Sequence, residues 1–392
     1  MSLSKKYLNI YDLRAAASKK LPKGVFEYID RGSEDEVAAH HNRECLDNLK
    51  LLPKSFRDLS GTNLSSKLFG QDLKYPLAIS PTGVAGLCWF EGELALAKAA
   101  KQCGIPFSLA TGSLTSIEKV AKEADGQLWF QLYVWQDEQA SMQLISRALN
   151  NGFKTLLVTV DIGLGNNREY NKRNGFSVPF QINSRSIIDV SMHPSWLFNV
   201  WLKYYLNGRP PGHANYPSSE AQSLFSGHSK KPKRNDALTW DLIDRIRELW
   251  PHNLVIKGIL NPQDAIEAKH HGIDGIVVSN HGGRNLDSSV SSITMLPHIK
   301  DAVGSDLALI YDSGVRRGSD IIKALALGAD CVMMGRPTLY GVAAAGEEGA
   351  VHAIHLLAEE SKKVMGYLGK TNIDELDHSV FAPSNLMHTL NV

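Results

Sequence analysis

Short apolar runs recur along the chain, and each is followed by a glycine or a turn and then, in most cases, by a helical pattern. The runs lie at residues 76–83, 106–112, 128–134, 155–161, 254–259, 275–282, 308–314 and 331–336. They are nearly continuous in hydrophobicity, which is typical of parallel strands buried on both faces. We therefore predict one parallel strand in each of the eight runs.

Helical patterns separate most of these runs. The clearest are "GELALAKAAKQCG" (92–104), "SIEKVAKEADG" (116–126), "NPQDAIEAKHHG" (261–272) and "RGSDIIKALALG" (317–328). The third places Asn before Pro at the first helical position and ends at Gly, as helices commonly do. Repeated strand-plus-helix units predict an α/β fold, a (β/α)8 TIM barrel with right-handed connections. An open doubly wound sheet is the alternative, because counting units does not prove that the sheet closes.

Two regions fall outside the repeat. The pattern in residues 1–75 predicts short helices followed by a polar, hairpin-like stretch. Residues 162–236 form a long insertion after the fourth predicted strand. Loops of that length in a compact domain are usually functional or disordered. We divide the chain into an N-terminal helical segment (1–75), a barrel (76–378) that contains the insertion, and a C-terminal tail (379–392).

Composition narrows the class of protein without identifying it. The chain has 392 residues, 43% apolar and 21% charged, with a net charge of +1, so nothing points to a nucleic-acid partner. The four cysteines are scattered, which favours reduced thiols over disulfides, and no Cys or His spacing predicts a metal site. No secretory signal and no run of about 18 uncharged apolar residues is present. We expect a cytoplasmic protein, with surface attachment to a membrane left open.

Polar and glycine residues gather where the predicted strands end, which is where TIM barrels hold their active sites. The stretch "IVVSNHGGRNLD" (276–287) delivers an imidazole, His281, and a guanidinium, Arg284, from the end of one buried strand. This is either an ordinary strand-to-loop junction or a base and an anion clamp aimed at one small molecule.

The last two strands end in "DSGVRRG" and "GRP". Glycines let backbone N–H groups approach an anion, and Arg316 and Arg336 could neutralise it, so we predict the usual phosphate site of this fold there. We interpret Arg317 as a solvated charge at a helix start. Lys257 ends an apolar strand, where it could form a Schiff base or act as a fixed positive charge; both remain open on the residues alone.

Several of these motifs are also similar to one known family. "SNHGGRNLD", "DSGVRRGSDIIKALALGAD", "MMGRP", "QLYV", "VTVD", "IKGI" and "LPKGVFEYIDRGSED" together resemble the FMN-dependent (S)-2-hydroxy acid dehydrogenases and oxidases, from about residue 8 to residue 378. That group includes glycolate oxidase, lactate dehydrogenases and mandelate dehydrogenase. The resemblance implies FMN as the cofactor and a 2-hydroxy acid as the substrate.

The resemblance also implies roles for individual residues. His281 would take a proton while electrons pass to flavin N5, and Asp161 would orient and stabilise the imidazolium. The substrate carboxylate would be bound by Arg168 and Arg284, assisted by Tyr28. Tyr133 would contact the substrate hydroxyl.

FMN contacts carry over in the same way. The family implies that the flavin edge, ring, ribityl chain and phosphate are held by Pro81, Thr82, Gly83, Gln131, Thr159, Lys257, Ser279, Asp312, Gly314, Arg316, Gly335 and Arg336. The resemblance implies that Lys257 would lie near flavin N1–O2 and stabilise negative charge on the reduced ring, which favours the fixed-charge alternative over the Schiff base.

The chain departs from the family pattern near the flavin. Ala110 replaces a usual serine, Gly112 replaces the bulky aromatic of glycolate oxidase, and Gly83 replaces its alanine, as mandelate dehydrogenase also shows. We expect the two glycines to empty space above the flavin. Burying a phenyl group there would contribute roughly 2–3 kcal/mol, which favours a mandelate-like aromatic substrate. Gly83 is therefore also a predicted substrate-binding residue.

The insertion bears on the electron acceptor. Residues 191–217 combine Trp, Phe, Leu and Tyr with basic margins, which suits an interfacial anchor on the inner face of the cell membrane. An active-site lid or a subunit contact would bury the same residues. The resemblance implies a quinone acceptor and a homotetramer. The alternatives are an L-lactate dehydrogenase using quinone or cytochrome, an oxygen-using oxidase, and a flavin-binding barrel without catalysis.

Overall fold

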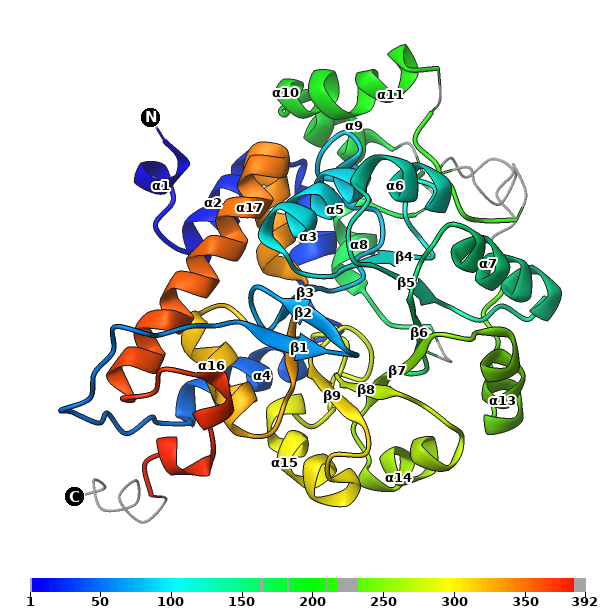
Figure 1. Cartoon of the computed structure of the whole chain (residues 1–392). Coiled ribbons are helices and arrows are strands. Elements are labelled where there is room, and N and C mark those ends of the chain that lie inside the picture. Colours follow the sequence, from blue (N-terminus) through cyan, green and yellow to red (C-terminus); the bar gives the residue numbers. More distant parts are fainter. Residues whose placement is uncertain are drawn as a thin grey trace.

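All eight apolar runs form strands, and the strands close into a barrel. The computed structural model describes residues 2–162, 165–178, 180–181, 183–208, 210–217, 224 and 232–383. The barrel strands are β3 (Leu77–Ile79), β4 (Phe107–Ala110), β5 (Leu128–Leu132), β6 (Thr155–Thr159), β7 (Asn253–Ile259), β8 (Gly275–Val278), β9 (Ala308–Tyr311) and β10 (Cys331–Met334). Each pairs in parallel with its neighbours, and β10 pairs with both β9 and β3 (Figure 1). The TIM barrel prediction is confirmed and the open sheet is excluded.

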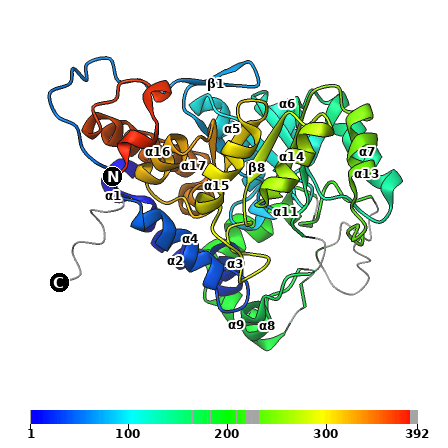
Figure 2. The same ribbon diagram turned by 90° about the horizontal axis from the view of Figure 1, so that it is seen from below.

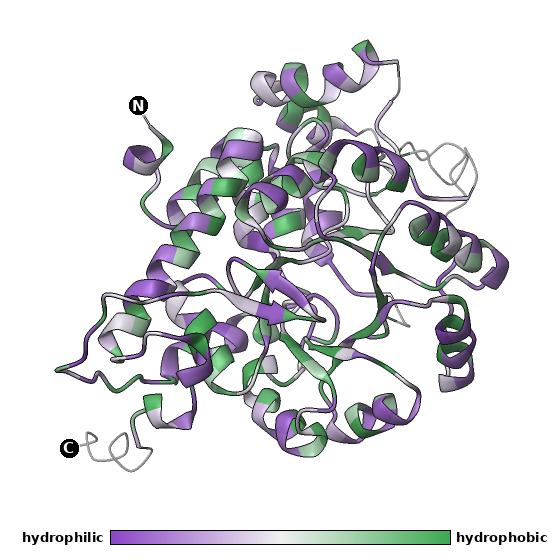
Figure 3. Ribbon diagram, in the orientation of Figure 1, coloured by the Kyte–Doolittle hydropathy of each residue, from purple (hydrophilic) through white to green (hydrophobic). Residues whose placement is uncertain are grey.

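Helices surround the barrel. They are α5 (Gly92–Cys103), α6 (Ile117–Ala124), α7 (Glu138–Asn150), α13 (Trp240–Leu249), α14 (Pro262–His270), α15 (Ser292–Val303), α16 (Gly318–Ala326) and α17 (Arg336–Tyr367), which kinks at Ala345 and Gly346. The four helices predicted most clearly are present, and the Ser116 hydroxyl caps α6 as the sequence indicates. Figure 3 shows these helices divided into hydrophobic and hydrophilic faces, as expected for helices that pack one face on a barrel.

The barrel interior is filled at its amino-terminal end. Inward-facing Trp129, Leu157 and Val255 belong to a buried cluster that also contains Ala78, Val277, Ile310, Cys331 and Met333. The antiparallel hairpin β1 (Ser66–Leu68) and β2 (Gln71–Leu73) adds Leu68 and Leu73 to the same cluster. The hairpin therefore plugs one end of the barrel, and the carboxyl ends of the strands are left for a site.

The N-terminal segment is helical, as predicted, and it reaches the carboxyl end of the barrel. Its helices are α1 (Leu3–Lys6), α2 (Ile10–Lys20), α3 (Lys23–Asp30) and α4 (Val37–Asn48). Helix α2 packs along α17, helix α3 contacts two helices of the insertion, and helix α4 contacts α15. Figure 2 shows α2, α3 and α4 in line along one side of the molecule, with α3 next to the insertion.

The insertion forms α8 (Glu169–Asn174), α9 (Ser184–Ser191), α10 (Pro194–Trp196), the π-helical turn η2 (Leu197–Trp201) and α11 (Leu202–Leu206). Trp196 and Tyr204 anchor it to the short helix η1 (Ala85–Leu87), since the indole donates to Leu87 O at 2.7 Å and the phenol donates to Gly86 O at 3.2 Å. Short turns η3 (Ile373–Glu375) and η4 (His378–Val380) follow α17. In the described ranges, every helix is too short or too polar to cross a bilayer.

Candidate active site

A cavity of about 1000 Å³ lies at the carboxyl end of the barrel, between the strand ends, the N-terminal segment and the insertion. Its wall includes Tyr28, Pro81, Thr82, Gly83, Tyr133, Arg168, Lys257, His281, Arg284, Asp312, Gly314, Arg316, Gly335 and Arg336. All fourteen were singled out from the sequence. The four others singled out, Asp161, Gln131, Thr159 and Ser279, do not line the cavity, and the last three are nearly fully buried.

Asp161 and His281 form a pair, although they come from the ends of different strands. His281 Nδ1 lies 3.0 and 3.1 Å from the two carboxylate oxygens of Asp161. His281 has a left-handed backbone, with φ of 59°, which directs its side chain off the strand at a cost of about 1–3 kcal/mol. Gly258 makes room for the pair, because a Cβ there would lie 2.6 Å from Asp161 Cβ.

The charges around the pair favour a neutral imidazole and an ionised carboxylate. Burial, together with the positive charges of Lys257 and Arg284, outweighs the attraction of Asp161 and lowers the pKa of His281. Burial alone would raise the pKa of Asp161, but His281 and Lys257 lower it below its usual value. A carboxylate can only accept, so Nδ1 of His281 carries the proton. Nε2 is then the basic nitrogen, and it lies 3.5 Å from the Tyr133 hydroxyl.

Lys257 lies in a buried polar network beside this pair. Its ammonium is 3.1 Å from Asp312 Oδ2 and 3.1 Å from Ser279 Oγ, and the two serine hydroxyls of Ser279 and Ser80 donate to Asp312 at 2.7 and 2.9 Å. Burial opposes a charged lysine, but Asp312 and Asp161 together raise the pKa of Lys257. The lysine therefore stays protonated, which favours the fixed-charge interpretation over a Schiff base.

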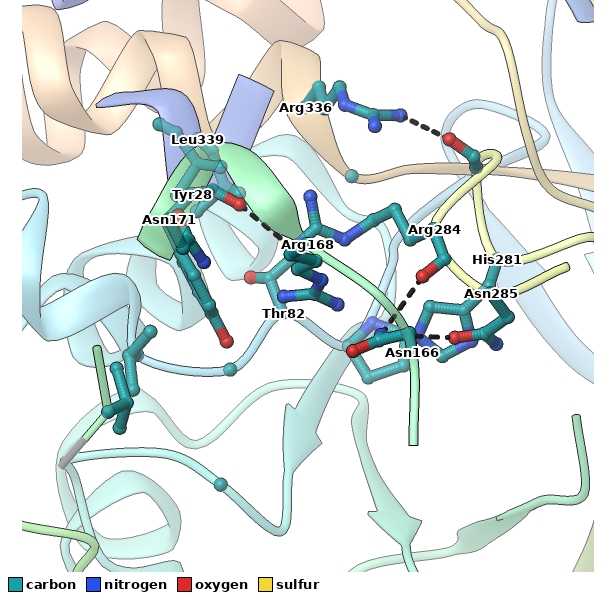
Figure 4. Close-up of a pocket in the computed structure, with 18 of the residues that line it drawn as sticks. Tyr28, Thr82, Asn166, Arg168, Asn171, His281, Arg284, Asn285, Arg336 and Leu339 are labelled. Atoms are coloured by element: carbon teal, nitrogen blue, oxygen red, sulfur yellow. Dashed lines mark hydrogen bonds between the residues drawn. The ribbon is translucent and has the colours of Figure 1, made fainter. Parts of the chain in front are cut away.

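Three guanidinium groups, those of Arg168, Arg284 and Arg336, also lie in the cavity wall. The carbons Cζ of Arg168 and Arg284 lie 5.2 and 5.4 Å from the centre of the Tyr28 ring, and Figure 4 shows the two side chains next to each other. Arg336 donates to Gly282 O at 2.9 Å. Burial and the positive charges of Arg168 and Arg336 lower the pKa of Arg284. Such a cluster is arranged to receive an anion.

The N-terminal segment holds the loop that carries His281 and Arg284. Arg284 donates to Arg31 O and to Tyr28 O, both at 2.8 Å. The buried amides of Asn42 and Asn280 bond reciprocally, at 2.8 and 2.9 Å. This amide pair could not be predicted from the sequence, because two single asparagines 238 positions apart form no motif.

Replacing Asn42 by Ala is expected to lower the free energy of unfolding by about 1–3 kcal/mol, since the buried Asn280 amide loses both bonds to Asn42 and keeps those to Val290 O and Gly283 N. Chemical denaturation followed by circular dichroism measures the change. Asn199→Ala, at an exposed helix position, is the matched control and should have little effect. Equal stability of the Asn42 variant and the wild type would contradict the assignment.

Part of the cavity wall was not predicted from the sequence. His213, Tyr216 and Arg234 come from the insertion and line the cavity, and Arg234 Cζ lies 4.5 Å from the centre of the Tyr133 ring. A Cβ at Gly112 would make ordinary contact with His213 and the Tyr216 hydroxyl at 3.9 Å, so these two side chains border the space that the missing side chain leaves. One feature of the sequence could have pointed to these residues. The insertion starts at the carboxyl end of a barrel strand, so part of it is expected to return to that end.

Comparison with known proteins places this site in a family. A model of the FMN-dependent dehydrogenases matches residues 17–383, so the chain belongs to that family. It is 38% identical to (S)-mandelate dehydrogenase of Pseudomonas putida over 391 residues, covering 100% of this chain and 98% of the relative. It is also 38% identical to L-lactate dehydrogenase of Pectobacterium atrosepticum, over 93% of this chain and 94% of the relative.

Solved structures agree. The crystal structure of monotopic membrane protein (S)-mandelate dehydrogenase superposes with a TM-score of 0.89 at 37% identity, covering 95% of this chain and 98% of that one. A mandelate oxidase variant with (S)-mandelic acid gives a TM-score of 0.78 at 32% identity, covering 94% of this chain and 96% of that one. The chain is thus an FMN-dependent dehydrogenase with the fold of these enzymes.

The cavity fits the cofactor that defines the family. Two arginines of the cavity wall, Arg168 and Arg336, each have an Nε that is buried without a hydrogen-bond partner among the described residues. Buried polar atoms of this kind are normally satisfied, so they point to a polar ligand. The first N–H groups of α16 are already bound by Asp320 and Glu360, whereas α17 has no side-chain cap at Gly335. The start of α17, beside Arg336, is therefore the better place for a phosphate.

Proposed function

We propose that the protein oxidises a small (S)-2-hydroxy acid to the 2-oxo acid within this cavity. The observation that carries the proposal is that His281, which is paired with the Asp161 carboxylate, lines the same cavity as the cluster of Arg168 and Arg284. A base and a carboxylate clamp are the two elements that this oxidation needs from the protein. The named activities of the relatives support the same substrate class.

FMN, when bound, supplies the two-electron acceptor for the oxidation. We propose that its ring and ribityl chain are held by Pro81, Thr82, Gly83, Gln131, Thr159, Lys257, Ser279 and Asp312, and its phosphate by Gly314, Arg316, Gly335 and Arg336. The protonated ammonium of Lys257 places a fixed positive charge in the ring region. A positive charge there stabilises negative charge that develops during reduction.

The protein's own part in the chemistry begins at His281. Its Nε2 takes a proton from the substrate, because Nδ1 is already hydrogen-bonded to Asp161. The Asp161 carboxylate fixes the ring orientation and stabilises the imidazolium once it forms. Tyr133, whose hydroxyl lies 3.5 Å from Nε2, contacts the substrate hydroxyl. Burial raises the pKa of Tyr133, so the phenol stays protonated and can donate a hydrogen bond.

The guanidinium cluster orients the substrate. Arg168 and Arg284 bind the carboxylate, and Tyr28, whose ring lies against both, supports them. A guanidinium–carboxylate fork fixes direction as well as charge. The α-carbon is thereby held on the side of the cavity where His281 can reach it.

We propose a mandelate-like aromatic acid as the substrate and a quinone as the electron acceptor. Gly83 supports the first part, because the nearest atom to a Cβ at that position would be Gly112 O at 3.7 Å, which leaves space. Steady-state assays with an artificial electron acceptor should show a higher kcat/KM for (S)-mandelate than for L-lactate. A strong preference for lactate would favour the lactate dehydrogenase alternative, and rapid turnover with oxygen alone would favour an oxidase.

The pH dependence follows from the His281 base. Only the neutral imidazole accepts a proton, and its pKa is below the usual value of about 6.5. We therefore expect kcat/KM to stay level through pH 7 and to fall only as the pH drops below that ordinary pKa. In Asp161→Asn the attractive negative charge is gone, so the acid limb should move to still lower pH. An acid limb above pH 7 in the wild type would contradict this assignment.

We also propose that the insertion attaches the protein to the membrane surface. Its exposed apolar side chains are Ile187, Ile188, Met192, Phe198, Leu202, Tyr205 and Leu206, between 38% and 76% exposed. They lie on α9–α11, at one end of the molecule in Figure 1. An apolar surface on short helices suits insertion into the interfacial layer of a bilayer. The anchor is shifted from the predicted 191–217, because His213 and Asn215 are buried over the barrel.

Phe198→Asp combined with Leu206→Asp is expected to abolish binding to phosphatidylethanolamine/phosphatidylglycerol vesicles while the flavin spectrum stays unchanged. Cosedimentation measures binding. Leu249→Asp, at an exposed position of α13, is the matched control and should bind like the wild type. A wild-type protein that remains in the supernatant would rule out the anchor.

A further inference from the structure

The part of the insertion around residues 213–216 is hydrogen-bonded to the carboxyl end of the barrel. Ala214 N donates to Ser113 O at 3.0 Å. The buried Asn215 side chain donates to Ser113 Oγ at 2.9 Å and accepts from Ile117 N at 3.1 Å. These bonds tie the loop to the β4–α6 connection at both the backbone and the side-chain level. Its side chains therefore have fixed positions in the cavity wall.

Two rings of this loop face the cavity together. The His213 and Tyr216 rings are stacked, with centroids 4.3 Å apart and an interplanar angle of 14°. Trp135 meets the Tyr216 ring edge-on at 5.5 Å, which holds the stack from the side. His213 Nδ1 lies 3.2 Å from Gly112 O, so this nitrogen donates to the carbonyl and the ring cannot turn freely.

The stack lies next to the positions assigned to the reaction. His213 borders Gly112, whose carbonyl oxygen is the nearest atom to a Cβ at Gly83. The hydroxyls of Tyr28 and Tyr133 are close enough to Tyr216 to affect its ionisation, and burial raises the pKa of Tyr216 to about 12. Tyr216 therefore remains a neutral, protonated phenol beside the two tyrosines assigned to substrate.

We infer that His213 and Tyr216 form the wall of the subsite for the substrate's α-substituent and make the enzyme select a flat aromatic ring over a methyl group. Aromatic pairs gain free energy beyond their buried area, and they do so in offset or edge-on geometries that a rigid stack can offer. A methyl group has no ring face or edge to offer to such a stack. This inference rests on the proposed oxidation of 2-hydroxy acids and adds the residues that choose among those acids.

The test compares kcat/KM for (S)-mandelate and L-lactate in the wild type, His213→Ala and Tyr216→Leu. Each substitution should lower the mandelate-to-lactate ratio by about tenfold or more, mainly through KM for mandelate, with lactate turnover nearly unchanged. Tyr367→Leu and His270→Ala, at exposed positions outside the cavity and the insertion, are the matched controls and should keep the wild-type ratio. The visible spectrum of bound flavin shows that each variant is folded.

The outcomes separate the two levels of the proposal. If no 2-hydroxy acid reduces the flavin of the wild type, the proposed function fails. If the wild type turns over such acids but the ratio is unchanged in both variants, or lactate is already preferred, the assignment of His213 and Tyr216 is overturned. Equal loss of both activities would also overturn it, because that result indicates a general structural role.

Discussion

Replacing His281 by glutamine is expected to lower kcat by about 10²–10⁴-fold, with little change in KM. Glutamine can still donate to Asp161 but cannot accept a proton, so binding survives and the proton transfer is lost. The steady-state rate with an artificial electron acceptor measures the effect. The absorbance of bound flavin confirms that the cavity is intact.

The matched control for this variant is His271→Gln. His271 is also paired with a carboxylate, Asp244, at 2.6 Å, but it lies on the outside of the barrel. It should retain wild-type activity. If the His281 variant kept more than a tenth of the wild-type kcat, another group would have to be the base.

Arg284→Met is expected to raise KM for the 2-hydroxy acid by about thirtyfold or more. Truncating one partner of a buried charged pair costs about 2–5 kcal/mol, and each 1.4 kcal/mol is a factor of ten. A neutral 2-hydroxy amide of the same shape has no carboxylate to pair, so its affinity should change much less. Inhibition constants for the amide and KM for the acid are therefore measured side by side.

Arg245→Met provides the comparison, because Arg245 is an exposed arginine paired with Glu138 on the outside of the barrel. It should leave both constants unchanged. Equal weakening of acid and amide by Arg284→Met would indicate that Arg284 acts only by supporting Arg31 O and Tyr28 O. The carboxylate clamp would then have to be Arg168 alone.

The barrel could be predicted because each strand is buried on both faces and leaves an uninterrupted apolar run. Closure could not, because strand runs look alike in a barrel and in an open sheet; pairing of β10 with β3 settles it. The same apolar runs showed where each strand ends, so His281 and Asp161 could be placed at strand ends from the sequence. Their mutual distance depends on the shape of the closed sheet and on the space at Gly258.

The less predictable half of the site comes from segments without periodicity. His213 and Tyr216 lie within a long insertion, and the hydrogen bonds of His213, Ala214 and Asn215 hold this part of it over the barrel. The hydrogen-bonded pair of Asn42 and Asn280 similarly joins α4, a helix near the N-terminus, to the loop after β8, the sixth barrel strand. In both cases the information lies in tertiary hydrogen bonds, which leave no pattern along the chain.

Anaerobic mixing of the purified yellow protein with 2-hydroxy acids tests most directly whether a flavin, a proton acceptor and a carboxylate clamp share this cavity. Loss of flavin absorbance in a stopped-flow spectrophotometer should be complete and saturable with (S)-mandelate and undetectable with (R)-mandelate. A flavin that dithionite reduces, but that no (S)-2-hydroxy acid of the panel bleaches, would contradict the proposed chemistry.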